Sequence, residues 1–151
     1  MLSLTRKTEY GLIAVTHLAH SEQRVVSARD IAEKYDVPLP LLMNVLKKLN
    51  RTGIVNSVRG ARGGYILAAP PEEITLTALI EAVEGPVHLT RCTNPRQDGR
   101  TCNLMKTCPV RGALGKVHRE LRSFLSRVTL ADVAREGHAP QQDDQAKVLA
   151  E

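Results

Sequence analysis

A tight turn between two short helical patterns constrains the fold of this chain more than any other feature. Ser27 is a favourable N-cap for a helix over SARDIAEKY, and Asp30 three residues later completes a variant of the capping box. Val37 and Pro38 end this helix, because proline disfavours helical geometry in the residue before it. The first helix is therefore short, and the sequence defines both of its ends.

The segment after the turn has the pattern of a second amphipathic helix. It begins near Pro40, a favourable first-turn residue, and stops at Gly53. Its apolar side chains recur at i, i+3, i+4 and i+7: Leu42, Val45, Leu46 and Leu49. The opposite face is polar and basic and consists of Asn44, Lys47, Lys48 and Arg51. Two short helices joined by a tight turn, the second basic on its outer face, predict a helix-turn-helix.

A glycine-rich hairpin follows directly. Ile54-Val55 and Tyr65-Ile66-Leu67 are strand-like, and RGARGG between them supplies glycines for tight turns. This order places Arg59 and Arg62 at the tip of the hairpin. A basic hairpin after a helix-turn-helix predicts a winged helix; the alternative is an ordinary pair of helices with a hairpin.

The distribution of charge favours the winged helix. The formal net charge is +5, yet no acidic residue occurs between Asp36 and Glu72. That window contains the cations Lys47, Lys48, Arg51, Arg59 and Arg62. Because a solvated surface normally mixes both signs, a long stretch of one sign indicates a polyanionic partner, in the first place nucleic acid. A basic surface without a partner is the alternative.

Helical patterns also flank this unit. TRKTEYGLIAVTHLAH repeats apolar residues at i and i+4, and ITLTALIEAVEGP predicts a short acidic helix. The last helix can open at Pro109, and its apolar residues are spaced 4, 3, 4, 3, 4: Val110, Leu114, Val117, Leu121, Phe124 and Val128. This period favours pairing with a second subunit over packing on the same chain. From about Gly137 the chain is polar, which predicts a mobile tail.

All three cysteines lie within residues 92–108, with the spacing C-x9-C-x5-C. Zinc sites favour C-x2-4-C pairs, which the sequence lacks. Wider spacing suits an iron–sulfur cluster, whose ligands reach around several metal atoms. Nearby cations favour the thiolate form: Arg91, Arg96, Arg100, Lys106 and Arg111. The alternatives are a redox-sensitive thiol switch, a zinc-stabilised loop, and thiols without a ligand.

Other classes of protein are not favoured. The N-terminus lacks the features of a targeting peptide, and no run approaches the ~18 apolar residues of a membrane span. A cytoplasmic protein without a membrane partner is therefore expected. The sequence shows no nucleophile–base set, phosphate-binding loop or paired carboxylates, so neither an enzyme nor a small-molecule substrate is expected.

Several stretches resemble the family of winged-helix iron–sulfur transcriptional repressors that includes IscR, NsrR and RirA: LTRKTEYGL, SARDIAEKYDVP, LKKLNRTGIVNSVRGARGGYILA and CPVRGAL. The resemblance covers about residues 2–135, and its most specific part is VRGARGGY followed by the cysteines. CPVRG further resembles members associated with Suf cluster assembly. The resemblance implies a homodimer that binds a near-palindromic DNA operator and carries a [2Fe–2S] or [4Fe–4S] cluster.

The resemblance also implies the cluster ligands. By position, the cysteine ligands are Cys92, Cys102 and Cys108. IscR-like members use a histidine as fourth ligand where this chain has Arg111, a fixed cation that cannot serve. NsrR-like members use an N-terminal acidic residue of the other subunit, and Glu9 stands at that position; a carboxylate on the solvent face is the alternative. His88 and His118 are outside candidates.

For DNA binding, the resemblance places the second helix of the helix-turn-helix in the major groove and the hairpin tip near the minor groove or the backbone. Asn44 suits a base edge, with adenine as its favoured partner, and Met43 replaces a glutamate of IscR-like members. A different operator preference is therefore expected. The predicted DNA-binding residues are Arg29, Leu39, Pro40, Leu41, Asn44, Lys47, Lys48, Arg51, Ser57, Arg59 and Arg62.

The expected architecture is mainly α-helical with a small β-hairpin: a winged helix-turn-helix and a long C-terminal dimerisation helix. The expected units are residues 1–70 for DNA binding, 71–108 for a connecting helix and the cysteine loop, 109–135 for the dimerisation helix and C-terminal segment, and 136–151 for a flexible tail. The expected function is control of operator affinity by the cluster, in response to iron, redox state or nitric oxide.

Overall fold

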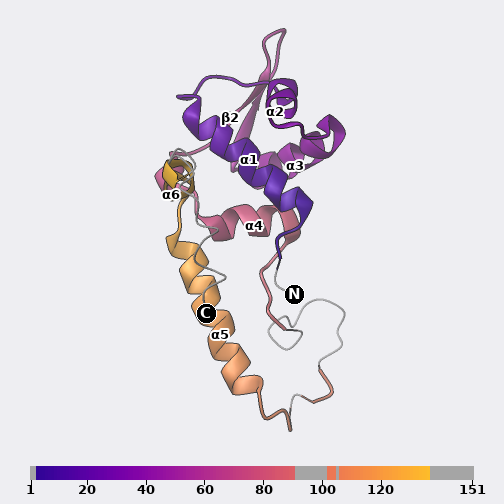
Figure 1. Cartoon of the computed structure of the whole chain (residues 1–151), viewed down its shortest axis with the longest axis vertical. Helices are drawn as coiled ribbons and strands as arrows, with labels where there is room; N and C mark the ends of the chain where they lie inside the picture. The colour runs from indigo at the N-terminus through magenta and orange to yellow at the C-terminus, as the bar shows by residue number, and fades with distance from the viewer. Residues whose placement is uncertain (1–2, 91–101, 105, 137–151) are drawn as a thin grey trace, which may run out of the picture.

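The computed structural model describes residues 3–90, 102–104 and 106–136. Its elements in this part of the chain are α1 (Arg6–His20), α2 (Ala28–Tyr35), α3 (Leu39–Arg51), β1 (Val55–Val58), β2 (Gly64–Leu67), the 3-10 helix η1 (Pro71–Glu73), α4 (Leu76–Glu84), α5 (Arg111–Arg127) and α6 (Leu130–Glu136). Figure 1 shows a body formed by α1–α4 and the hairpin, with α5 extending away from it. The prediction of a mainly helical chain with a small hairpin is confirmed.

The core of the body lies between α1, α3 and α4. The apolar stripe predicted on α3 is at most 1% exposed: Leu42, Val45, Leu46 and Leu49. α1 contributes Ala14, Val15 and Leu18, and α4 contributes Leu79 and Val83. Full burial of a Val or Leu side chain stabilises a fold by about 1.5–3 kcal/mol. The periodicity of α3 is therefore the main reason that this helix is fixed on the body.

Local hydrogen bonds set the ends of the helix-turn-helix. The Ser27 hydroxyl oxygen accepts from the Asp30 N–H at 3.1 Å, as the capping pattern predicted. α2 ends at Tyr35, and its C-cap residue Asp36 has a left-handed φ of 52°. Pro38 occupies the N-cap position of α3. The turn between the two helices is thus only a few residues long.

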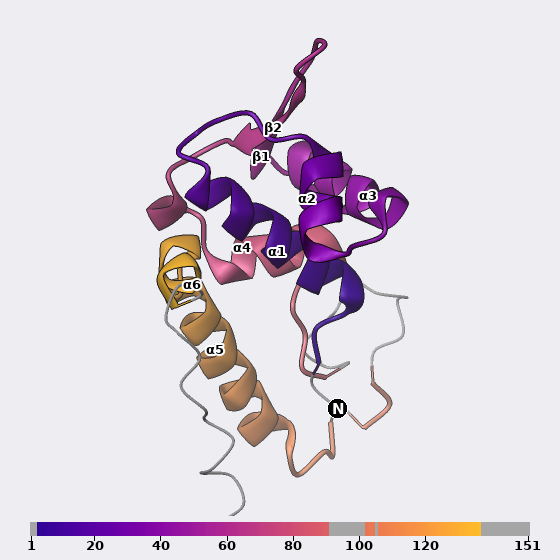
Figure 2. The same ribbon diagram turned by 45° about the horizontal axis from the view of Figure 1, so that its top comes forward.

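The hairpin is antiparallel, with Val55 opposite Leu67 and Val58 opposite Gly64. A bridge joins it to the segment before α2: the Val26 N–H donates to the Tyr65 carbonyl at 3.1 Å, and the Tyr65 N–H donates back at 2.8 Å. A Cβ on Gly64 would overlap the Val26 carbonyl, so only glycine fits there. In Figures 1 and 2 the hairpin protrudes from the body as a wing.

The C-terminal region contains two helices that differ in how they pack against the body. α5 ends at Arg127, whereas α6 packs back against α1 and η1 and buries Leu130 fully. Thr129 and Asp132 form a reciprocal cap at the start of α6: the Thr129 hydroxyl accepts from the Asp132 N–H at 3.2 Å, and the Asp132 carboxylate accepts from the Thr129 N–H at 2.9 Å. The expected unit of residues 109–135 therefore contains an extended helix and a helix that belongs to the body.

Two predictions fall on residues outside this description. Cys92 lies in the segment 91–101, and the tail predicted from 136 onward lies almost wholly in 137–151. Within the described residues, no helix has the length and apolar character needed to span a membrane.

Candidate nucleic-acid interface and cysteine loop

α3 presents one face to solvent, opposite its buried stripe. Its residues follow one another at i, i+3, i+4 and i+7, and all are exposed: Pro40, Met43, Asn44 and Lys47. Arg51, one turn after Lys47, is exposed as well. A helix in the major groove contacts base edges mainly through residues of its N-terminal half. Met43 and Asn44 are therefore the residues of this face best placed to read bases.

Lys48 points away from this face. Its Nζ donates a hydrogen bond to the Val83 carbonyl oxygen, in the last turn of α4, at 2.7 Å. This bond satisfies a carbonyl that the helix itself leaves unpaired, and it ties α3 to α4. A DNA contact by Lys48 would require this bond to break, which sets Lys48 apart from Lys47.

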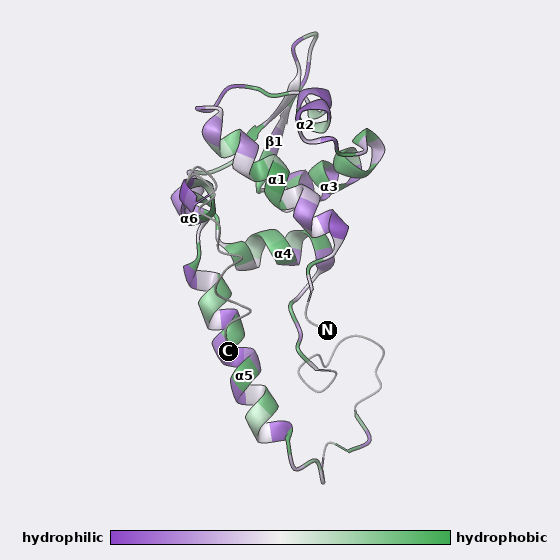
Figure 3. Cartoon of the chain, viewed as in Figure 1, coloured by the Kyte–Doolittle hydropathy of each residue, from purple (hydrophilic) through white to green (hydrophobic). Residues whose placement is uncertain are grey.

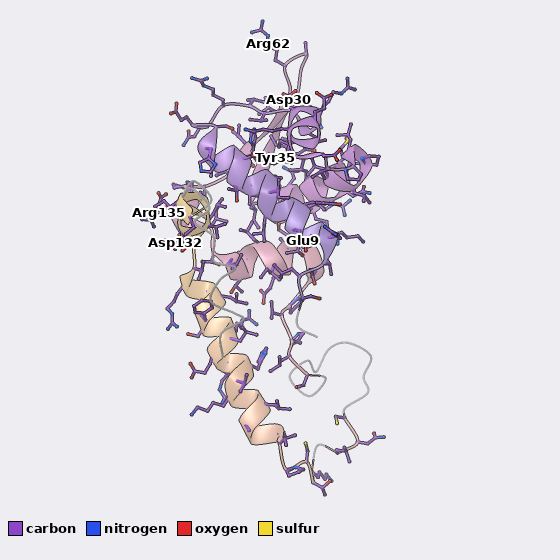
Figure 4. All side chains as sticks on the ribbon, in the orientation of Figure 1. Glu9, Asp30, Tyr35, Arg62, Asp132 and Arg135 are labelled. Carbon is purple, nitrogen blue, oxygen red and sulfur yellow. The ribbon has the colours of Figure 1, made fainter. Side chains whose placement is uncertain are left out.

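The other residues predicted to bind DNA surround the exposed face of α3. Those that are exposed are Arg29, Leu41, Ser57, Arg59 and Arg62. Leu39 is half-buried and packs against the core. Figure 4 shows Arg62 at the far end of the wing. α2, α3 and the wing thus each contribute an exposed cation.

Cys102 and Cys108 lie shortly before α5. Both are free thiols and half-buried. The Cys108 N–H donates to the Leu104 carbonyl oxygen at 2.8 Å, and the Thr107 N–H donates to the same oxygen at 3.1 Å, so a turn fixes the backbone of Cys108. Two such thiols suit ligation of a metal or cluster, and they also suit oxidation. No group of three metal-ligating side chains occurs among the described residues, from which Cys92 is missing.

Glu9 lies in the first turn of α1. Its carboxylate pairs with Arg6 at 3.3 Å, and both side chains are partly exposed. Figure 4 labels Glu9 at this end of α1. A surface pair of this kind contributes little stability, so Glu9 can leave it at low cost. The described part of one protomer does not bring Glu9 into a ligand group with Cys102 and Cys108.

Glu84, at the end of α4, is a residue that the sequence did not single out. Its carboxylate accepts hydrogen bonds from the Thr8 hydroxyl and from the Thr5 N–H, the latter at 3.0 Å. The Thr8 bond lowers the pKa of Glu84, and Thr5 and Lys48 act in the same direction while burial opposes them. Glu84 therefore fixes the start of α1 beside Glu9. Because this contact joins distant parts of the chain, no local pattern signals it.

His88 and His118 stack against each other, one on each side of the cysteine loop in sequence. Their ring centroids are 5.9 Å apart and their planes differ by 18°. Both Nδ1 atoms are buried, and neither has a hydrogen-bond partner among the described residues. Burial lowers the pKa of His118, and the charges of His88, Arg122 and Arg119 lower it further. The pair joins the segment after α4 to α5.

α5 contains no buried residue, although the hydropathy colours of Figure 3 show hydrophobic residues along its length. The predicted seam is divided. Val110, Val117 and Phe124 are 51%, 52% and 55% exposed, whereas Leu114, Leu121 and Val128 are half-buried. This exposed apolar edge is unpaired within the described chain.

α5 is attached to α4 along its other side. Arg122 and Glu81 form an ion pair at 2.9 Å, and the Thr77 and Ser126 hydroxyls are 3.1 Å apart. A cavity of about 480 Å³ lies between the two helices, and its apolar lining includes Ile80. The attachment leaves the edge with Val117 and Phe124 facing outward.

A short helix-turn-helix with a basic wing defines a winged-helix DNA-binding regulator, here extended by a long helix. The model of the Rrf2 family, described as an iron-dependent transcriptional regulator, matches residues 4–136. The chain belongs to the Rrf2 family of transcriptional regulators.

Individual relatives agree with this assignment. The chain is 32% identical to the HTH-type transcriptional regulator IscR of Serratia proteamaculans over 133 residues, which are 87% of this chain and 79% of the relative. It is similar to the structure of T. potens IscR, with 30% identity, a TM-score of 0.71, and coverage of 93% of this chain and 92% of the other. It is also similar to the oxidized form of Staphylococcus aureus CymR, with 28% identity, a TM-score of 0.65, and coverage of 88% and 96%. The resemblance seen in the sequence is confirmed.

Proposed function

We propose that this chain is a homodimeric transcriptional repressor whose operator affinity is controlled by an iron–sulfur cluster. Cys92, Cys102 and Cys108 supply the thiolate ligands, and Glu9 of the second subunit supplies the fourth. The position of Cys102 and Cys108 carries the proposal: two free thiols stand directly before a helix with an exposed apolar edge. A change at the cysteines can therefore change how the two subunits are arranged in the dimer.

The second copy of the chain covers the apolar edge of α5. Val117 and Phe124 are each more than half exposed, and they recur with the period of a helix–helix seam. Exposed apolar side chains in a continuous row indicate an interface more strongly than isolated ones do. The partner brings its own α1, and with it Glu9, into reach of the cysteine loop.

The route from the loop to DNA passes through the end of α4. Glu84 holds the start of α1, and the Val83 carbonyl holds Lys48 of α3. The chain then continues through Gly85 toward the cysteines. A rearrangement of the loop that moves this end of α4 acts on both helices, and the spacing of two recognition helices sets the fit to an operator. Coupling of this kind requires different affinities in the two states, typically by ~1–3 kcal/mol.

The donor set fits the cluster that the family implies. The two described thiols are unbridged, and thiolates are the ligands that iron–sulfur clusters use. When bound, the cluster supplies chemistry that responds to iron, redox state or nitric oxide. The chain supplies the thiolate ligands, two of them from the described Cys102 and Cys108.

A thiol-redox switch without a cluster is the second candidate. Cys102 and Cys108 are free and accessible enough to react, and the CymR relative was solved in an oxidized form. An oxidant would then take two electrons from two thiols, which lose two protons and form a disulfide. A zinc-stabilised loop is a further alternative, and metal analysis separates it from both.

The test compares the wild type with Cys102→Ala after purification without oxygen. We expect visible charge-transfer absorption with matched iron and acid-labile sulfide in the wild type, and their loss in Cys102→Ala with the dimer preserved. Thr107→Ala, in the same turn, is the control and retains both. A full cluster in Cys102→Ala contradicts the ligand assignment. A colourless wild type that resists reconstitution supports the thiol switch, or the zinc loop if zinc is present.

A further inference from the structure

The exposed face of α3 carries an apolar side chain among polar ones. Met43 is 38% exposed, and the exposed Pro40 lies beside it at i−3. Asn44 and Lys47 belong to the same face. Isolated exposed apolar residues are common on protein surfaces, so exposure alone decides nothing. The informative feature is the position of Met43 in the N-terminal half of a helix that reads DNA.

The chemistry of methionine limits what Met43 can read. Its thioether donates no hydrogen bond and is a weak acceptor, so it cannot pair with the polar edges of guanine or cytosine. Thymine is the base that presents a methyl group in the major groove. A methionine side chain is long, flexible and apolar, and it adapts to contacts of this kind.

Asn44 also favours A·T base pairs. A carboxamide can make two hydrogen bonds to adenine, through N6 and N7. Since adenine pairs with thymine, the preferences of Met43 and Asn44 both select A·T pairs. The cations around them, including Lys47 and Arg59, suit phosphates, and phosphate contacts carry no sequence information.

We propose that Met43 contacts the 5-methyl group of a thymine in each operator half-site and, together with Asn44, selects A·T pairs there. The proposal rests on the proposed function in one respect: α3 lies in the major groove. It adds a residue that determines specificity and the chemical group that this residue recognises.

Deoxyuridine provides a direct test, because it differs from thymidine only by the absence of the methyl group. A binding sequence is first selected from random duplex DNA with the full-length wild type. Each thymine is then replaced by deoxyuridine, one position at a time, and the affinity is measured by fluorescence anisotropy. We expect about three- to fourfold weaker binding at one position per half-site, the size expected for one methyl-sized apolar contact.

Two variants assign the effect to a residue. Met43→Ala should bind the thymine operator more weakly and bind the thymine and uracil operators equally. Val25→Ala is the matched control: Val25 is 41% exposed, but it precedes α2 and is not among the predicted DNA-binding residues. It should leave the ratio between thymine and uracil unchanged. Circular dichroism confirms that both variants are folded.

Three results would overturn the inference. The first is equal binding of thymine and uracil at every position, and the second is an unchanged ratio in Met43→Ala. The third is selection of G·C pairs throughout each half-site. Failure to enrich any sequence is a different outcome, because it rejects DNA reading by α3 and therefore the proposed function itself.

Discussion

Gly64 shows at the scale of one residue how the wing is held. Its backbone lies so close to Val26 that a Cβ would overlap the Val26 carbonyl and approach the Ser27 nitrogen at 3.0 Å. Gly64→Ala must therefore displace the bridge between Val26 and Tyr65. We expect the free energy of unfolding to fall by about 1–3 kcal/mol, the usual cost of overpacking. Chemical denaturation measures this change.

Gly112→Ala is the control for this substitution. Gly112 lies in the first turn of α5, and no atom of the described residues outside the adjoining backbone lies within 4 Å of a Cβ built there. We expect no loss of stability and a gain of up to about 1 kcal/mol, because alanine has the higher helix propensity. Equal stabilities of Gly64→Ala and the wild type would contradict the account of the wing.

His118, which stacks on His88, makes stability depend on pH. The pKa of His118 is lowered in the folded chain, first by burial and then by His88, Arg122 and Arg119. Between this lowered value and the ordinary value of about 6.5, the unfolded chain binds more protons than the folded chain. The contribution of the neutral ring is therefore present above the ordinary pKa and is lost as the pH falls through the lowered one.

His118→Gln tests this dependence. Compared at about pH 7.5 and about pH 5.5, the wild type should lose more stability on acidification than His118→Gln, as judged from denaturant midpoints. The stability of His118→Gln should still depend on pH, because burial, Lys34 and His20 lower the pKa of His17. Identical losses in the two proteins would show that His118 does not titrate as proposed.

At the scale of elements, α3 carries two adjacent lysines with different tasks. Lys47 is exposed on the face of α3 predicted to contact DNA, whereas Lys48 Nζ donates to the Val83 carbonyl oxygen at 2.7 Å. Lys47→Met should weaken operator binding and lower the slope of log affinity against log salt by about one per subunit, with stability unchanged. Lys48→Met should lower the free energy of unfolding by about 1 kcal/mol.

The pair of variants separates the two tasks. Salt titrations of binding and denaturant curves are measured on both proteins. If Lys48→Met changes the salt slope as much as Lys47→Met does, Lys48 contacts a phosphate after all, and its bond to α4 is not maintained on DNA.

α5 provides the second test at this scale. Phe124 is 55% exposed on the apolar edge, and Ser123 next to it is exposed and polar. Phe124→Glu should convert the dimer into a monomer in sedimentation experiments, because a carboxylate in the seam loses its hydration without a partner. Ser123→Glu should remain dimeric. If Phe124→Glu is still a dimer, the dimer interface does not include this edge of α5.

The sequence predicted the elements whose ends depend on local signals. α2 and α3 follow from the Ser27 cap, the turn at Pro38 and the stripe of α3, and the hairpin follows from its glycines. The sequence pattern did not predict α6 as a separate helix. The apolar spacing continues to Val128, although α5 ends at Arg127. The capping pattern TLAD at 129–132 was the available signal.

Contacts across the chain could not be predicted in the same way. Glu84 with Thr8, Lys48 with Val83, and His88 with His118 each join residues from different elements. Only packing of the whole chain decides them. The residues for DNA binding, cluster ligation and dimerisation came from side-chain chemistry and from the family resemblance, and they stay predictions until variants are measured.

At the scale of the whole molecule, α3, the helix proposed to read DNA, and the described cysteines Cys102 and Cys108 lie in different parts of the fold. Figure 1 shows α3 in the body, whereas α5, next to the cysteines in sequence, extends away from it. The end of α4 is the described connection between them, through Glu84 and the Val83 carbonyl. Under the proposed function, control of DNA binding by the cysteines requires this connection and the second subunit.

The most direct test of this account is the operator affinity of one anaerobic sample before and after chelation of its iron. Both measurements use the same selected duplex, salt concentration and fluorescence anisotropy signal, and both states are checked for the dimer. The account predicts a change of roughly 5- to 150-fold, the range that allosteric coupling usually spans. Equal affinities of the cluster-loaded and cluster-free dimers would contradict control of DNA binding by the cluster.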